Sequence, residues 1–133
     1  MAFSEFPDAQ LFENLALKHG HYCPMSTLGL RIGWAALRTL DGIDSASYHA
    51  KTCAVDGIRL VFGSEGLEVN DQGQHVLRFS DNKSSWQIEL LPETLELAAS
   101  YRQLATENER NLLLEKLRFA DESGLLLIKQ DMA

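Results

Sequence analysis

The residues best suited to chemistry in this chain lie in one short segment, Lys18 to Gly33, which reads KHGHYCPMSTLGLRIG. His19, His21 and Cys23 fall at every second position, and alternate side chains of an extended segment point to the same side. Imidazole and thiolate groups together suit zinc, with nickel and iron as alternatives. The spacing therefore indicates a local metal site, although a local triad of this kind also arises by chance.

Cys23 has a second feature, because it directly precedes Pro24 and proline favours the first position of a helix. A cysteine at the cap of a helix meets the partial positive charge of its N-terminus, which favours the thiolate. Cys23 is therefore the candidate catalytic residue, as a metal ligand, a nucleophile or each in turn. The alternative is a polar loop in which Cys23 is only a small buried hydrophobe.

Tetrahedral coordination requires a fourth ligand, and Cys53 is the obvious candidate because it stands between a predicted strand and a predicted helix. A structural disulfide between the two cysteines is not expected in a reducing cytoplasm. His49 and His75 have no ligand-type neighbours at useful spacing. We therefore predict that both are strand or surface histidines.

The helices that must position these residues are predicted from local signals. A short amphipathic helix is expected from Pro7 and Asp8 to Gly20, where glycine can end it. The segment before Pro24 must be extended or irregular, because proline disfavours helical geometry at the preceding residue. The helix that begins at Pro24 runs to about Leu40 and is apolar on most of its surface, so we expect it to be the central buried helix.

Two glycines, Gly29 and Gly33, share one face of the predicted central helix. Glycine lowers helix stability unless packing requires it, so we expect another backbone to approach at this face. The segment CAVDGIRLVFG at 53–63 predicts a short helix that ends at Gly63.

The remaining sequence predicts a small sheet and further helices. Residues 47–52 predict a short strand, and the alternating segments 75–80 and 85–91 predict a hairpin. Helices are expected to begin at Pro92 and at Thr106, which can form a capping box with Glu109, while residues 124–130 fit a strand or a closing segment. The predicted fold class is α+β, a small antiparallel sheet packed with a long central helix and further helices, in a single domain over residues 1–133.

Composition narrows the classes of partner. The chain has 133 residues, 45% of them hydrophobic, which is enough for one compact core. Its net charge of −7, without a basic cluster, argues against nucleic-acid binding. No apolar run approaches the ~20 residues of a membrane span, and the acidic N-terminal stretch lacks the features of a secretory signal. We expect a cytoplasmic protein without membrane or nucleic-acid partners.

The segments HGHYCP…LGLRIGWAAL and CAVDGIRLVFG resemble the paired motifs of the family of proteins like the E subunit of formylmethanofuran dehydrogenase, in the same order and with suitable spacing. The resemblance covers about residues 10–91. It implies an α+β core domain, often dimeric, here without the family's cysteine-rich C-terminal zinc module, because no cysteine follows Cys53. It further implies a metal site at His19, His21, Cys23 and Cys53, with Asp56 accepting an N–H from a ligating histidine.

Two positions depart from the family's pattern. Met25 replaces the glycine after Cys-Pro, and a methionine can narrow the approach to the thiolate or offer a thioether. Ser64 stands where the family has a cysteine, and the following Gly-Lys-Gly segment is missing. These differences predict that metal binding or the reaction differs from that of the family.

Three functions follow from the sequence. The first is a metal-binding enzyme or accessory subunit of one-carbon or redox metabolism, acting on a small molecule. The second is a metal-free thiol redox protein in which His21 is the base and Cys53 resolves a disulfide with Cys23. The third is a non-catalytic interaction subunit. The long apolar helix and the last helix carry more hydrophobic surface than a small sheet covers, so we expect a homodimer.

Overall fold

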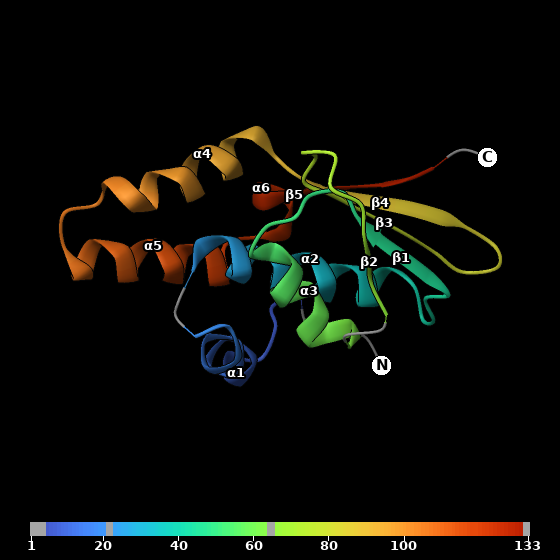
Figure 1. Cartoon of the computed structure of the whole chain (residues 1–133), viewed down its shortest axis with the longest axis horizontal. Helices are drawn as coiled ribbons and strands as arrows, with labels where there is room; N and C mark the ends of the chain where they lie inside the picture. Colours follow the sequence, from blue (N-terminus) through green and yellow to red (C-terminus); the bar gives the residue numbers. More distant parts are fainter. Residues whose placement is uncertain (1–4, 21–22, 64–65, 132–133) are drawn as a thin grey trace.

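The computed structural model describes residues 5–20, 23–63 and 66–131, except for the side chain of His19. In chain order, the elements are α1 (Ala9–His19), α2 (Pro24–Thr39), β1 (Ser45–Tyr48), α3 (Ala54–Phe62), β2 (Glu68–Val69), β3 (Val76–Ser80), β4 (Ser85–Leu90), α4 (Pro92–Ser100), the 3-10 turn η1 (Tyr101–Gln103), α5 (Glu107–Phe119), α6 (Glu122–Leu125) and β5 (Leu126–Gln130). Figure 1 shows the sheet at one end of the molecule and the α4–α5 hairpin extending from the other.

The strands form one sheet in the order β2-β1-β3-β4-β5. Three of the pairings are antiparallel, and in register they align Tyr48 with Leu77, Leu77 with Ile88, and Ile88 with Ile128. The pairing of β1 with β2 is parallel, because α3 returns the chain to the end at which β1 begins. The α+β prediction is confirmed, but the sheet is mixed rather than wholly antiparallel.

The strand predicted at residues 47–52 lies earlier, at Ser45–Tyr48. The chain leaves the sheet at His49, whose carbonyl accepts hydrogen bonds from the backbone N–H groups of Gln72 and Gln74. These bonds to the loop after β2 replace a continuing ladder with β3. The predicted hairpin at β3 and β4 is confirmed, and the closing segment is α6 followed by β5, which pairs with β4.

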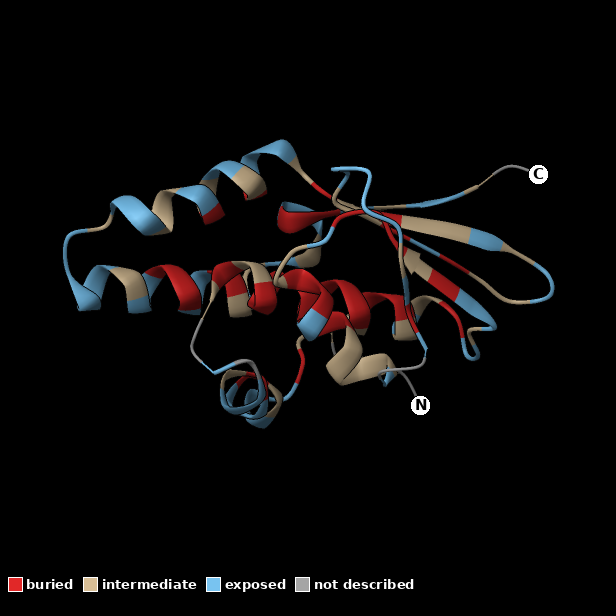
Figure 2. Cartoon of the chain, viewed as in Figure 1, coloured by how far each residue is buried: buried red, intermediate tan, exposed pale blue. Residues whose placement is uncertain are grey.

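The core lies between one face of the sheet and α2. Figure 2 shows α2 as the most continuously buried helix, as predicted from its apolar surface. Buried side chains of α2 such as Leu28 and Ile32 belong to the same cluster as Leu77, Phe79 and Ile88 of the sheet. Within the described ranges, no helix is long and apolar enough to cross a bilayer.

Helices α2 and α3 pack backbone to backbone, which confirms the expectation for Gly29. A Cβ atom on Gly29 would lie 2.0 Å from the carbonyl oxygen of Ala54, and one on Gly57 would lie 2.2 Å from that of Ser26. The approach at Gly33 is looser, since a Cβ atom there would lie 3.3 Å from the side chain of Val61 and 3.4 Å from the backbone Cα of Ile58. Glycines on both helices therefore allow the first turns of α2 and α3 to lie side by side.

Helix α5 is attached to α2 by a buried arginine. Arg31, with no exposed surface, donates to the carbonyl oxygens of Leu117, Arg118 and Ala120 at 3.0, 2.8 and 2.6 Å. These carbonyls end α5 and have no partners within the helix. The predicted capping box starts the same helix, since the Thr106 hydroxyl accepts from the Glu109 N–H and donates to its carboxylate.

Candidate functional site

The two thiols are brought together by the packing of α2 against α3. Cys23 is the N-cap of α2, with the extended backbone (φ −147°, ψ 132°) that its position before Pro24 predicts. Cys53 is the N-cap of α3. Both are free and partly buried, and the Cys53 thiol is hydrogen-bonded to Cys23. The pairing of the cysteines from the two sequence motifs is thus a feature of the fold.

The environment of Cys53 favours its protonated form. Burial is the largest cause of a raised pKa of Cys53, and the negative charge and hydrogen bonding of Cys23 act in the same direction, followed by the charge of Asp56. A backbone hydrogen bond partly opposes these effects. In the metal-free protein Cys53 is therefore a thiol at neutral pH, and a cation that binds it must displace the proton.

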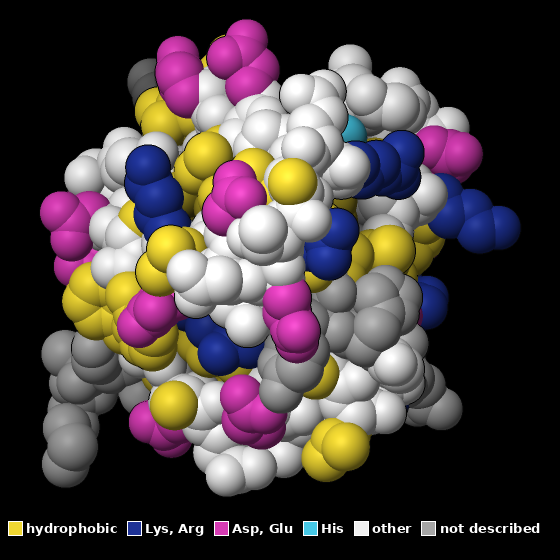
Figure 3. Space-filling model, turned by 90° about the vertical axis from the view of Figure 1, so that its left-hand side faces the viewer, with side chains coloured by type: hydrophobic (Ala, Val, Ile, Leu, Met, Phe, Trp, Pro, Cys, Tyr) yellow, Lys and Arg dark blue, Asp and Glu magenta, His cyan; other side chains and the backbone are white. Residues whose placement is uncertain are grey.

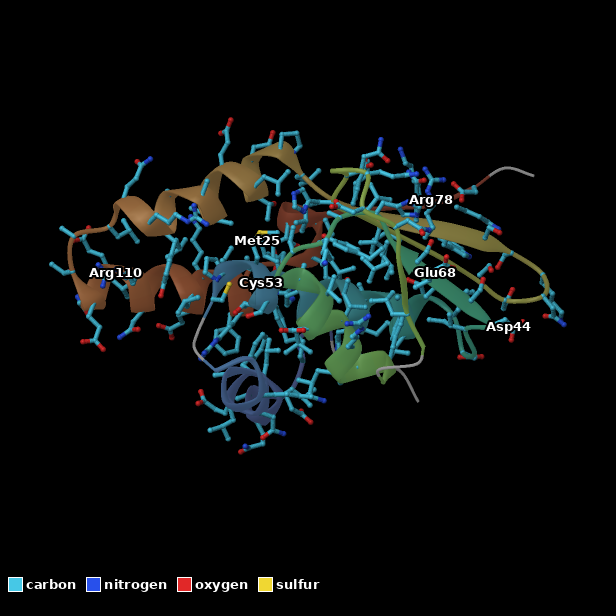
Figure 4. The ribbon with its side chains drawn as sticks, in the orientation of Figure 1. Met25, Asp44, Cys53, Glu68, Arg78 and Arg110 are labelled. Carbon is cyan, nitrogen blue, oxygen red and sulfur yellow. The ribbon has the colours of Figure 1, made fainter. Side chains whose placement is uncertain are left out.

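A cavity of about 550 Å³ opens beside the two thiols. Its wall comes from the start of α2, the segment before α3, the residue before β3, and the α4–η1 segment. The lining residues are Cys23, Pro24, Met25, Thr52, Cys53, His75, Leu95, Ala98, Ala99, Tyr101 and Arg102. In the view of Figure 4, Cys53 and Met25 lie below α4, at the start of α2 and α3. The volume is in the range of small-molecule sites.

His75 belongs to this cavity, which sequence spacing did not indicate. It directly precedes β3, and the pairing of Tyr48 with Leu77 brings it to the end of β1. Its Nδ1 lies 3.4 Å from the Tyr48 hydroxyl, and burial lowers the pKa of His75. The prediction of a simple strand or surface histidine was therefore incomplete. His49 instead bonds Ser47 and Gln72 and does not line the cavity.

The other predicted ligands, His21 and the side chain of His19, lie outside the described residues, as does Ser64. Among the residues whose side chains are described, no group of three His, Cys, Asp or Glu could hold an ion. The described part of the predicted ligand set is the pair Cys23 and Cys53. Asp56 lies exposed in the first turn of α3, and its contact with a ligating histidine stays a prediction.

Comparison with known proteins extends the resemblance beyond the two motifs. Residues 18–123 match the family model described as FmdE, Molybdenum formylmethanofuran dehydrogenase operon. A crystal structure of a tungsten formylmethanofuran dehydrogenase FmdE-like protein from Syntrophus aciditrophicus has a similar fold, with a TM-score of 0.64. It shares 21% identity, and the match covers 93% of this chain and 71% of that chain. A comparison with curated proteins found no match.

Proposed function

Because this chain belongs to the FmdE family, we propose that it is a metal-binding protein that holds zinc, or else nickel or iron, through Cys23 and Cys53. The proposal rests on one observation: these two thiols come from separate sequence motifs but lie next to each other at the edge of one cavity. Two thiolates are half of the donor set that a tetrahedral zinc site needs. His19 and His21 supply the remaining donors in this proposal.

The cavity beside the thiols, rather than the number of donors, favours a reactive site over a closed structural one. A small molecule in this cavity could bind the ion at a fifth position or in place of one of the histidines. When bound, such an ion polarises a carbonyl group or activates water. The residues of the chain would then hold the ion, admit the small molecule along Leu95 and Ala98, and limit access with Met25.

Metal content of the purified protein tests the proposal. We expect about one transition-metal ion per chain after anaerobic preparation without chelator, and loss of the ion in Cys23→Ser, Cys53→Ser and His21→Ala. His49→Gln is the matched control, because His49 bonds Ser47 and Gln72 away from the cavity and should leave the metal content unchanged. Wild-type protein that contains no ion and takes up none of the three metals would overturn the proposal.

A second function is favoured by the same hydrogen-bonded pair of thiols. In this alternative, Cys23 attacks an external disulfide and Cys53 displaces the mixed intermediate, so that two thiols become one disulfide and the external disulfide becomes two thiols. Glutathione disulfide is a suitable oxidant. Oxidised protein should then be about 2 Da lighter per chain. Failure to form the intramolecular disulfide over a range of glutathione ratios contradicts this alternative.

A homodimer remains our proposal for the assembly, on the last of the two helices first expected to carry surplus apolar surface, but not on the central one. The central helix is covered by α3, the sheet and α5, so it has no apolar surplus. Large exposed hydrophobic side chains instead lie on α1 and α5, where Leu17, Leu112 and Phe119 are 83%, 58% and 48% exposed. Sedimentation of Leu112→Glu tests this surface: the wild type should sediment as a dimer and the variant as a monomer. A monomeric wild type at micromolar concentration contradicts it.

A further inference from the structure

The wall of the cavity beside the thiols differs in charge from the rest of the chain. The sequence has 19 acidic and 12 basic residues, and Figure 3 shows acidic side chains spread over one face of the molecule. Yet no Asp or Glu is among the described residues that line the cavity, which include Arg102 and His75. A cavity with cationic and neutral donors in an acidic protein selects an anion over a cation as its organic ligand.

A chain of hydrogen bonds determines which ring nitrogen of His75 can donate a hydrogen bond into the cavity. The Ala54 N–H donates to Thr52 Oγ1 at 3.2 Å, and Thr52 is hydrogen-bonded to the Tyr48 hydroxyl. Burial raises the pKa of Tyr48 far above its ordinary value, so the hydroxyl keeps its proton. That proton is available for His75 Nδ1, 3.4 Å away.

With Tyr48 as the donor of this bond, the tautomer of His75 follows. A neutral imidazole carries one proton, and a nitrogen that accepts a hydrogen bond does not hold it. With Nδ1 accepting from Tyr48, the proton lies on Nε2. No other described residue is hydrogen-bonded to Nε2. His75 therefore presents a donor to a ligand in the cavity that it lines.

Arg102 supplies a permanent charge to the same wall. It lies in η1, is exposed, and forms no hydrogen bond or ion pair with another described residue. Its guanidinium can pair with a carboxylate through two parallel hydrogen bonds. Leu95, Ala98 and Ala99 contribute apolar surface to the same wall.

We propose that the cavity binds a small monocarboxylate with a short apolar body. Arg102 and the Nε2–H of His75 bind the carboxylate, and the body packs against Leu95, Ala98 and Ala99 beside the thiols. One arginine and one neutral donor suit a single negative charge better than a phosphate dianion, and the apolar wall suits an aliphatic body. The inference rests on the proposed function for its location, since it places the ligand next to the Cys23–Cys53 site.

Calorimetric binding of butyrate and of its neutral isostere butyramide tests the proposal on the full chain. We expect butyrate to bind and butyramide to bind at least about tenfold more weakly, the effect of losing a charge-assisted hydrogen bond. Arg102→Gln should weaken butyrate binding by a similar factor. Arg78→Gln is the matched control, because it removes the same charge from the exposed side of β3, outside this cavity.

Alkylation of the thiols gives a second readout that requires no stable complex. The reagents iodoacetate and iodoacetamide transfer similar groups to sulfur, releasing iodide and the thiol proton, but only iodoacetate is anionic. In chelator-treated, reduced protein, Arg102→Gln should lower the ratio of the iodoacetate rate to the iodoacetamide rate by about fivefold, the effect of one screened unit charge at contact distance. Arg78→Gln should leave this ratio unchanged.

Metal content measured on the same samples separates this inference from the proposed function. Arg102→Gln should keep the metal content of the wild type while losing butyrate. Butyrate binding that is absent from the wild type, or unchanged in Arg102→Gln, overturns the carboxylate inference whatever the metal content. Absence of metal together with Arg102-dependent butyrate binding overturns the metal proposal alone.

Discussion

Gly29 lies against the carbonyl of Ala54, the residue that follows Cys53, so closely that a methyl group on Gly29 would be 2.0 Å from that oxygen. The two cysteines that face the cavity are therefore brought together by a glycine six residues after Cys23. The close packing of α2 and α3 is a condition for the site.

Gly29→Ala should accordingly disturb both stability and the thiol pair. We expect the free energy of unfolding to fall by about 2 kcal/mol or more, the effect of overpacking a rigid contact, and the metal content to fall because the helices must separate. Urea denaturation and metal analysis measure the two effects. Gly42→Ala is the control, since a Cβ there meets open space and its backbone needs no positive φ; equal losses in both variants would contradict the prediction.

The raised pKa of Cys53 predicts a pH dependence of stability in the metal-free protein. The folded state holds the thiol proton more tightly than the unfolded chain, whose thiol titrates near ~8.5. The stabilising contribution is therefore fully present below that pH and is lost as the pH rises toward the folded pKa. Thermal denaturation from pH 7 to 10 should show this loss in the wild type and a smaller one in Cys53→Ser. Identical profiles would exclude the effect.

Metal binding should depend on pH for the same reason. A cation that binds Cys53 must displace its proton, so zinc affinity is expected to increase as the pH rises from 6 to 8. Calorimetry in two buffers of different ionisation enthalpy measures the number of protons released. Binding without proton release would show that the thiols are not ligands.

Substitution of Arg31 should lower the free energy of unfolding more than substitution of the other charged residues. Arg31→Met leaves three carbonyls at the end of α5 without donors, and we expect a loss of about 3 kcal/mol or more. Arg31→Lys should lose less free energy of unfolding than Arg31→Met but should still be less stable than the wild type, because an ammonium cannot reproduce the planar fork of a guanidinium. Arg38→Gln, on the same helix but in a solvent-accessible ion pair with Glu122, should cost less than about 1 kcal/mol. Urea denaturation that finds equal losses would show that Arg31 has no special role.

Tyr48→Phe tests the hydrogen-bond chain behind His75. Without the hydroxyl, Nδ1 loses its donor, so we expect the ring to populate both neutral tautomers instead of the Nε2–H form alone. Long-range proton–nitrogen NMR correlations distinguish these tautomers directly, and butyrate binding should weaken several-fold. Tyr101→Phe, in the same cavity wall, is the control for the spectra. A wild-type ring protonated at Nδ1 would refute the assignment.

The features that could be predicted from the amino-acid sequence are local ones. Pro24 imposes an extended backbone on Cys23, Thr106 and Glu109 cap a helix, and the alternation before and after residues 81–84 predicts a hairpin. Each signal acts through sterics or hydrogen bonds between residues only a few positions apart. The two cysteine motifs could also be identified in the sequence, which predicted, but could not establish, that their cysteines lie side by side.

The surroundings of the thiols depend on long-range packing instead. The parallel pairing of β2, the place of His75 beside Tyr48, and the contact of Arg31 with the end of α5 join residues that are 21 to 89 positions apart in the chain. The spacing of residues along the chain does not predict such contacts, because sheet register and helix packing select them from many alternatives. The thiols could be named from the sequence, but the cavity that gives them a ligand class comes from the fold.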